Sequence, residues 1–306
     1  MKKGDAMKGM ILAAGYGTRL EPLTSYLPKP LVPVGNRPVI DRLIDYLKQY
    51  TIEEIVVNAH YHRDRITTHL DGGRPFGVKI QVRAEPDILG TGGGIKNTQD
   101  FWGDKSFVVI NGDILTDIDL SQAYELHQRR ANLVTLILHD YARFNQVRVD
   151  SKMNIMDINA TPGPGKLAFT GIHIMEPGLL SRIPAGVFSN IIDCYRNLIK
   201  EGAQIQGFFS EGHYWRDIGT LDHYLLANRE AAGRQAFLIG GDCDISASAR
   251  LKDWAVIGPE CILAREVEIV RSVLWARVRV KPGVKILDSV VTAEKEVSAD
   301  VIRGVI

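Results

Sequence analysis

A six-residue hydrophobic repeat near the C-terminus restricts the fold of this chain more than any other feature of the sequence. The main column holds Val256, Ile262, Leu274, Val280 and Ile286, with Glu268 as its one exception; Val278, Val284 and Val290 form a second column, and Val267 and Val273 a third. Helices do not repeat with this period, whereas the flat sides of a parallel β-helix do. About 60 residues at roughly 18 per coil predict about three coils. An ordinary antiparallel meander is the alternative.

The first half of the chain alternates short apolar runs with helical patterns. Glu54–Asn58 and Phe107–Ile110 are expected strands, and the second is apolar throughout, as in a strand buried on both faces. This alternation predicts an α/β fold, a mixed, mostly parallel Rossmann-like sheet flanked by helices. Further strands are expected at 78–82, 133–138, 146–149, 154–158 and 169–175, and helices at 63–70, 121–130, 190–200 and 220–234.

The composition excludes several kinds of partner. Lys plus Arg is 37 and Asp plus Glu is 36, which argues against binding to nucleic acid or to an acidic membrane surface. No apolar run approaches the roughly 18 residues of a membrane span, and residues 1–10 lack the apolar core of a signal peptide. Cys194, Cys243 and Cys261 are odd in number and widely spaced, which favours reduced thiols. We therefore expect a cytoplasmic protein.

A glycine-containing segment directly follows the first apolar run, Met10–Ala13. It reads LAAGYGTRLEPLT over residues 12–24 and continues as LPKPL over 27–31. Gly15 and Gly17 let backbone N–H groups approach a phosphate closely. Arg19 and Lys29 add two cations that can bind phosphate oxygens. The segment is therefore suited to a nucleoside triphosphate.

Two better-known phosphate loops do not match this segment. It lacks the G-x-x-x-x-G-K-[ST] pattern of a P-loop, and Leu20 stands where a dinucleotide fingerprint has its third glycine. Pro22, Pro28 and Pro30 disfavour a helix that starts at once. A hydride-transferring dinucleotide enzyme is therefore disfavoured.

Two acidic residues far apart in the sequence are candidate metal ligands. Asp113 follows the strand Phe107–Ile110 through Gly112, at the sheet edge where ligands bind in open α/β folds. Asp217 lies in the segment YWRDIGT. Two carboxylates can hold a hard cation that prefers oxygen ligands and keeps several waters.

The pattern L-A-A-G-x-G-T-R-L-x-P-L-T…P-K-P resembles the signature of the sugar-1-phosphate nucleotidylyltransferases, over residues 8 to about 230. The resemblance implies a nucleotidyltransferase domain over 1–235 and a short left-handed parallel β-helix over 236–306. It implies transfer of a nucleotidyl group from a nucleoside triphosphate to a sugar-1-phosphate, with release of pyrophosphate.

The resemblance also implies roles for individual residues. The implied nucleotide-binding residues are Leu12, Ala13, Ala14, Gly15, Gly17, Thr18, Arg19, Lys29, Glu85, Gly90, Thr91 and Asn111. Arg19, Lys29 and Asp113 are implied to be catalytic, and Asp113 and Asp217 to bind Mg²⁺. Thr170, Gly171 and Trp215 are implied to bind the sugar phosphate. Glu85 is expected to accept hydrogen bonds from the base, with Gly90 to Gly93 packed against it.

Two subfamilies match different parts of the chain. The runs TGGGI, FTGIH and the block Asn111–Asp119 look like N-acetylmuramic acid-1-phosphate uridylyltransferases, which lack a β-helix. The architecture with a tail looks like mannose-1-phosphate guanylyltransferases, and we expect a GDP-mannose type with the UTP type as the alternative. The F-x-E-K-P segment that holds the sugar phosphate in many members is absent. Arg143, Asn145 and Lys166 are the candidate substitutes.

Other functions are less well supported. A non-catalytic subunit that binds nucleotide sugars is disfavoured because Arg19, Lys29, Asp113 and Asp217 are all present. An acyltransferase in the β-helix is disfavoured because residues 237–306 contain no histidine. We expect the tail to mediate contacts in a homo-oligomer. His60, His62 and His173 are expected to be ordinary surface or core histidines.

Overall fold

The computed structural model describes residues 7–159 and 161–306, and their contacts divide the chain into two compact units. The first unit comprises Met1–Gly15 and Ile40–Trp215, and the second comprises Tyr16–Val39 and Arg216–Ile306. The division predicted at residues 235 and 236 stays a prediction. We expected no signal peptide in residues 1–10, and residues 1–6 of that segment lie outside the described residues. No described helix is both long enough and apolar enough to cross a membrane.

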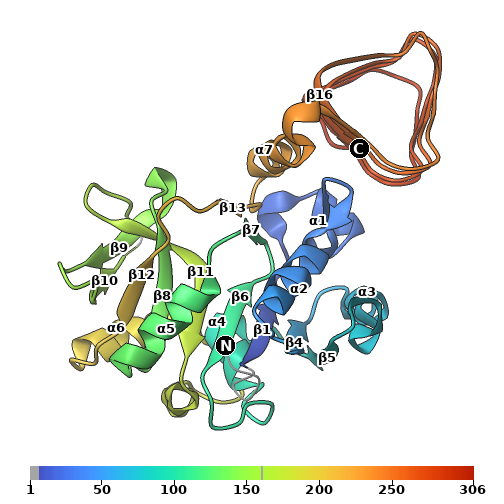
Figure 1. The fold of residues 1–306 in the computed structure, drawn as a ribbon. Helices are drawn as coiled ribbons and strands as arrows, with labels where there is room; N and C mark the ends of the chain where they lie inside the picture. The colour runs from blue at the N-terminus through green and yellow to red at the C-terminus, as the bar shows by residue number, and fades with distance from the viewer. Residues whose placement is uncertain (1–6, 160) are drawn as a thin grey trace. The chain divides into compact units, whose positions relative to one another are not determined.

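A nine-stranded sheet forms the centre of the first unit, in the order β10-β9-β11-β6-β1-β4-β5, with β8 beside β11 and β12 beside β8 (Figure 1). Its strands are β1 Lys8–Leu12, β4 Glu54–Ala59, β5 Lys79–Ala84, β6 Phe107–Asn111, β8 Val134–His139, β9 Asn145–Val149, β10 Ile155–Ile158, β11 Leu167–Met175 and β12 Gln206–Phe209. β1, β4, β5 and β6 pair in parallel, whereas β11 runs antiparallel to β6, β8 and β9. The expected mixed, mostly parallel sheet is confirmed.

Helices and short turns connect these strands. They are α2 Val39–Gln49, α3 Arg63–Leu70, η3 Asp71–Phe76, α4 Gly90–Lys96, α5 Leu120–Arg130, η4 Ala142–Phe144, η5 Pro177–Arg182 and α6 Ile191–Lys200, with the short strands β7 Ile114–Thr116 and, at the junction of the units, β13 Trp215–Asp217. On one side of the sheet Met10, Val56 and Val109 pack with Ile95 of α4 and Tyr195 of α6 in a buried apolar cluster. Removal of this apolar surface from water stabilises the unit.

The glycine-rich stretch after β5 is helical. Gly90 to Gly94 lie in α4, although glycine costs about 1 kcal/mol per residue in a helix. The carbonyl of Ser189 accepts hydrogen bonds from the N–H groups of Gly92, at 2.8 Å, and Gly93, at 3.2 Å. A Cβ on Gly93 would lie 2.7 Å from the backbone carbonyl oxygen of Val187, so a larger residue there would require the backbone to shift.

The helical segments between residues 16 and 38 are all short, as the prolines predicted. They are η1 Thr18–Leu20, α1 Leu23–Tyr26 and η2 Lys29–Leu31, followed by the hairpin β2 Pro33–Val34 and β3 Arg37–Pro38. The later helical elements are α7 Leu221–Ala232 and η6 Gly233–Gln235. The Thr220 hydroxyl accepts from the N–H of His223 and so caps α7.

The C-terminal strands all pair in parallel and stack as coils with a triangular outline (Figure 1). They are β14 Phe237–Ile239, β15 Asp244–Ile245, β16 Arg250–Ile257, β17 Ile262–Leu263, β18 Glu268–Leu274, β19 Arg279–Val280, β20 Lys285–Leu287, β21 Val290–Val291, β22 Glu296–Val297 and β23 Val301–Ile302. The parallel arrangement supports the β-helix and excludes the meander. Its left-handedness stays a prediction.

The β-helix has more coils than the roughly three that we expected. One ladder joins Leu238, Val256, Val273, Val290 and Val305 in four steps. The first pair, Leu238 and Val256, is 18 positions apart in the sequence, and the later pairs are closer together. The parallel pairing begins at β14, before the first residue of the six-residue repeat, Val256. The six-residue grid fails at Glu268 because the buried residue at this point of β18 is the next one, Ile269.

Charged side chains are stacked at one corner of the β-helix. Asp253, Arg271, Asp288 and Arg303 occupy successive coils with φ between 46° and 59°. The Arg271 guanidinium contacts both carboxylates, with 2.8 Å from its Nη2 to Oδ2 of Asp288. It thereby lowers the pKa of Asp288. The alternation of charge places each carboxylate next to a cation, so like charges do not meet between coils.

Candidate active site

The carboxyl ends of three central strands of the first unit meet at one level of the sheet. Leu12, the last residue of β1, pairs with Asn58 of β4 on one side and with Asn111 of β6 on the other. The carbonyl of Leu12 accepts a hydrogen bond from the N–H of Gly112 at 2.9 Å. This edge is where ligands bind in open α/β sheets. Two of the predicted nucleotide-binding residues, Leu12 and Asn111, lie on it.

Asn58 holds this edge together and was not among the predicted site residues. Its side chain is buried, and its Oδ1 accepts from the N–H of Ala13 at 2.8 Å. Its Nδ2 donates to Oε1 of Glu85 at 2.7 Å. The sequence does contain a signal, because Asn58 is a polar residue within the otherwise apolar end of β4.

Glu85 lies beneath the edge with only 1% of its surface exposed. Its second carboxylate oxygen accepts from the N–H of Leu89 at 3.1 Å. A Cβ on Gly94 would lie 2.8 Å from Oε1 of Glu85 and 2.7 Å from Nδ2 of Asn58. The carboxylate of Glu85 thus joins β4, α4 and the preceding loop. Its predicted contact with a base stays a prediction.

Thr91 and the glycines of α4 face the segment 187–191. The Thr91 hydroxyl accepts from the N–H of Ile191 at 3.0 Å and lies 3.4 Å from Oδ1 of Asn190. A Cβ on Gly90 would lie 2.6 Å from the carbonyl oxygen of Ser189. These contacts account for the small residues at positions 90–94 without a ligand. The predicted roles of Gly90 and Thr91 toward the nucleotide stay predictions.

The predicted sugar-binding strand β11 approaches β6 very closely. Gly171 has a φ of +80°, and a Cβ there would lie 2.4 Å from Nδ2 of Asn111. The Thr170 side chain is buried, and its hydroxyl donates to the carbonyl of Ile137 at 2.8 Å. The indole N–H of Trp215 donates to the carbonyl of Thr170 at 2.9 Å. The structure therefore brings Asn111, Thr170, Gly171 and Trp215 together.

Aromatic rings surround Trp215 within the first unit. Tyr141 lies edge-on at 5.6 Å between ring centroids, and Phe144 lies at 6.1 Å. Of the candidate substitutes for the sugar-phosphate lysine, Asn145 binds the N–H of Tyr141 and the carboxylate of Asp140. Lys166 donates to the Asn159 side chain and the Thr161 carbonyl, both at 3.0 Å. Arg143 is exposed, with its guanidinium 5.9 Å from the centre of the Phe144 ring.

The predicted triphosphate turn is divided between the units, with Gly15 in the first and Gly17, Thr18, Arg19 and Lys29 in the second. Gly17 has a φ of +70°, and a Cβ there would lie 2.7 Å from Cγ2 of Thr24. The Thr24 hydroxyl donates to the carbonyl of Gly17 at 3.1 Å. Thr18 and Arg19 are exposed, whereas Lys29 is 9% exposed. Arg19 is therefore exposed on a turn whose backbone requires glycine at position 17.

Arg19 and Asp217 face the same glycine in the second unit. A Cβ on Gly219 would lie 2.7 Å from Oδ1 of Asp217 and 3.2 Å from Nη2 of Arg19. Oδ1 of Asp217 accepts from the N–H of Gly219 at 2.9 Å, and Nδ1 of His223 lies 3.3 Å away. The structure therefore brings together a predicted phosphate-binding cation and a predicted metal ligand.

Asp113 leaves the sheet edge between β6 and β7 in the first unit and is half-buried. Within residues 7–159 and 161–306, no three His, Cys, Asp or Glu side chains form a metal-binding group. Carboxylates at 113 and 217 suit a hard cation that takes most of its ligands from water and phosphate, as Mg²⁺ does. The donor chemistry therefore fits Mg²⁺, and binding there stays a prediction.

His173 and His60 each have a partner within the first unit. His173 is fully buried, its Nδ1 lies 2.5 Å from the Tyr195 hydroxyl, and burial lowers its pKa to about 3. Nδ1 of His60 lies 2.8 Å from the carbonyl oxygen of Glu85. His62 precedes α3 with a φ of 50°.

Comparison with known proteins finds relatives among the nucleotidyl transferases. A family model described as nucleotidyl transferase matches residues 8–234. A UTP–glucose-1-phosphate uridylyltransferase of Synechocystis is 28% identical, over 93% of this chain and 87% of its own length. A mannose-1-phosphate guanyltransferase of Aspergillus oryzae is 29% identical, over 80% of this chain and 73% of its own. An N-acetylmuramate α-1-phosphate uridylyltransferase of Neisseria meningitidis is 33% identical, over 70% of this chain and 94% of its own length.

Proposed function

This chain belongs to the nucleotidyl transferase family, and we propose that it joins a nucleoside triphosphate to a sugar-1-phosphate. The products are a nucleotide sugar and pyrophosphate. The observation that carries the proposal is that Arg19, on the turn whose sequence has the family's signature, and Asp217 both lie close to Gly219. A cation for phosphate and a carboxylate for a metal are the two groups that this reaction needs.

In the proposed reaction, a phosphate oxygen of the sugar-1-phosphate attacks the α-phosphorus of the nucleotide. The new P–O bond forms as the bond to the β-phosphate oxygen breaks, and pyrophosphate leaves with the electron pair. Arg19 and Lys29 bind the phosphate oxygens and stabilise the charge that builds up on the leaving group. No covalent enzyme intermediate is needed, because positioning and electrostatics supply the acceleration.

Asp113 and Asp217 are the residues that would hold Mg²⁺. When bound, Mg²⁺ supplies positive charge between two phosphate groups that otherwise repel each other. Asn58 and Glu85 keep the carboxyl ends of β1 and β4 in register beside the proposed nucleotide site. Gly171 allows the sugar-binding strand to reach Asn111.

We propose GTP and mannose-1-phosphate as the substrate pair. The Aspergillus relative, named for this pair, and the presence of a β-helix tail support it. UTP is the second candidate, favoured by the Synechocystis and Neisseria relatives. We also propose that the chain works in the cytoplasm as a homo-oligomer joined through its β-helix.

The test is pyrophosphate release with ATP, GTP, UTP and dTTP, each combined with mannose-, glucose- and N-acetylmuramic acid-1-phosphate. We expect release to be fastest with GTP and mannose-1-phosphate and to reverse on addition of pyrophosphate. Faster release with a UTP pair would replace the first candidate by the second. Nucleotide-sugar binding without release from any pair would instead identify a non-catalytic subunit.

A further inference from the structure

The block Asn111–Asp119 contains more polar residues than the proposed reaction uses. Asp113 is assigned to the metal, but Thr116 and Asp117 have no role in it. Asp117 follows β7, and its side chain is 66% exposed. An exposed carboxylate at the end of a short strand is usually solvated, so its contacts decide whether it has a further role.

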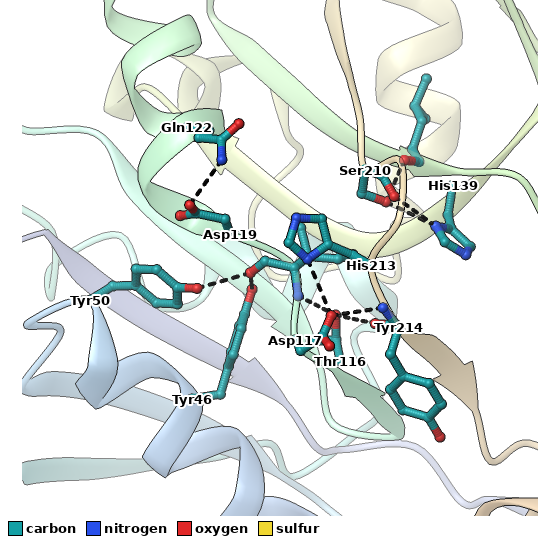
Figure 2. Close-up of polar contacts among 12 residues, drawn as sticks. Tyr46, Tyr50, Thr116, Asp117, Asp119, Gln122, His139, Ser210, His213 and Tyr214 are labelled. Carbon is teal, nitrogen blue, oxygen red and sulfur yellow. Dashed lines mark hydrogen bonds and ion pairs between the residues drawn. The ribbon is translucent and has the colours of Figure 1, made fainter. Parts of the chain in front are cut away.

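Thr116 and Asp117 bind both backbone polar groups of Tyr214 (Figure 2). Oδ1 of Asp117 accepts from the N–H of Tyr214 at 2.7 Å, and Nδ1 of His213 lies 3.2 Å from the same oxygen. The carbonyl of Tyr214 accepts from the Thr116 hydroxyl at 3.1 Å and from the N–H of Asp117 at 3.2 Å. We call this set of contacts the Thr116–Asp117 clamp.

The segment that the clamp holds is anchored at its other end as well. The N–H and hydroxyl of Ser210 both donate to the carbonyl of Leu138, at 2.8 and 2.9 Å. The Ser210 hydroxyl also lies 3.0 Å from Nδ1 of His139 (Figure 2). Between these anchors the backbone turns at Gly212, with a φ of +77°. Both ends of the link 210–214 are therefore fixed to the rest of the first unit.

The chain passes from the first unit to the second directly after this link, between Trp215 and Arg216. Asp217 is three residues beyond Tyr214, and Asp113 is three residues before Thr116. Three residues span at most roughly 10 Å. The clamp lies next to the pairing of β7 with β13. β7 follows Asp113, and β13 ends at Asp217.

We propose that Thr116 and Asp117 are positioning residues, which set the backbone of Tyr214 and thereby the course of the chain into β13, the strand that ends at Asp217. This inference rests on the proposed Mg²⁺ site. Partners that orient metal ligands typically change metal affinity by about 10- to 100-fold when they are removed. The clamp does not touch the ion, so it acts on affinity through the geometry of the ligands alone.

The test compares Asp117→Ala and Thr116→Val with the conservative variants Asp117→Asn and Thr116→Ser. Hydrogen exchange of the Tyr214 amide is measured in the metal-free protein, and Mn²⁺ affinity is measured by electron paramagnetic resonance with nucleotide present. For Asp117→Ala we expect faster exchange at Tyr214 and about tenfold weaker Mn²⁺ binding. The Asn and Ser variants keep an acceptor or a hydroxyl and should stay near wild type in both measurements.

Asp119→Ala is the matched control. Asp119 is in the same block, but it caps α5 by accepting from the N–H of Ser121 at 2.8 Å. Its loss should lower the melting temperature and leave Mn²⁺ affinity unchanged. Wild-type exchange or wild-type Mn²⁺ affinity in Asp117→Ala would overturn the positioning role. Failure of the wild-type chain to bind Mn²⁺ or release pyrophosphate would instead overturn the proposed function, and the positioning role with it.

Discussion

Replacement of Gly171 by Ala tests whether the close approach of β11 to β6 builds the site. An L-residue at a φ of +80° costs about 1–2 kcal/mol. The new Cβ would also lie 2.4 Å from Nδ2 of Asn111, and forced overpacking costs about 1–3 kcal/mol more. We expect Gly171→Ala to lower the free energy of unfolding in urea by about 2–5 kcal/mol. Displacement of Asn111 should lower kcat/KM by about a hundredfold.

Gly165→Ala separates the cost of the positive φ from the cost of the clash with Asn111. Gly165 has a φ of +70°, but a Cβ there meets no atom within 4 Å. It should therefore lose only the backbone component, about 1–2 kcal/mol, with activity unchanged. The double variant Asn111→Ala/Gly171→Ala should be less destabilised than the sum of the single variants, because the clash is relieved. Equal stability of the Gly171 and Gly165 variants, or full activity in Gly171→Ala, would refute the reasoning.

Two further predictions concern buried polar groups of the first unit. Asn58→Ala should lower the free energy of unfolding by about 2–3 kcal/mol, since it leaves the Glu85 carboxylate and the Ala13 N–H without this partner; an unchanged urea midpoint would contradict this. Burial lowers the pKa of His173 to about 3, so as pH falls below about 6.5 the unfolded chain takes up the proton first. Stability should therefore be full above pH 6.5 and about 2 kcal/mol lower by pH 5. His173→Gln should lack this loss, and an identical pH dependence in both proteins would contradict it.

The fold was predictable where a single segment determines its own structure. The bounds of α3, Arg63–Leu70, agree with its polar and apolar spacing, and β6 contains the predicted run Phe107–Ile110. The six-residue repeat predicted a parallel β-helix because each coil buries its own aliphatic side chains. The number of coils was wrong mainly because the pairing begins at β14, before the region that the repeat marks, and partly because the later coils are shorter than 18 residues.

Features that depend on distant segments were not predictable. α4 has a glycine composition that disfavours a helix, and it forms because the segment around Ser189, about 100 positions later, satisfies its first N–H groups. Asn58 and Glu85 form a buried pair across 27 positions, which no local pattern indicates. Likewise, Asp117 has a partner in Tyr214 that only the folded chain brings near.

The site was predicted mainly from the family signature. Gly17 was assigned to phosphate binding, and its positive φ and its close contact with Thr24 also require glycine at this position. Glu85 and Thr170 were assigned to ligands, but their side-chain oxygens have partners within the chain. Residue type indicates which groups can bind a ligand, whereas the neighbours in space decide which oxygens are already engaged.

Mn²⁺ titration by electron paramagnetic resonance, with nucleoside triphosphate present, tests the central claim most directly. If Asp113 and Asp217 hold one divalent ion, the wild-type chain should bind a single Mn²⁺. Asp113→Asn and Asp217→Asn should each abolish that binding, and with it pyrophosphate release, while the melting temperature stays near that of wild type. Unchanged Mn²⁺ affinity in either variant would contradict a shared ion.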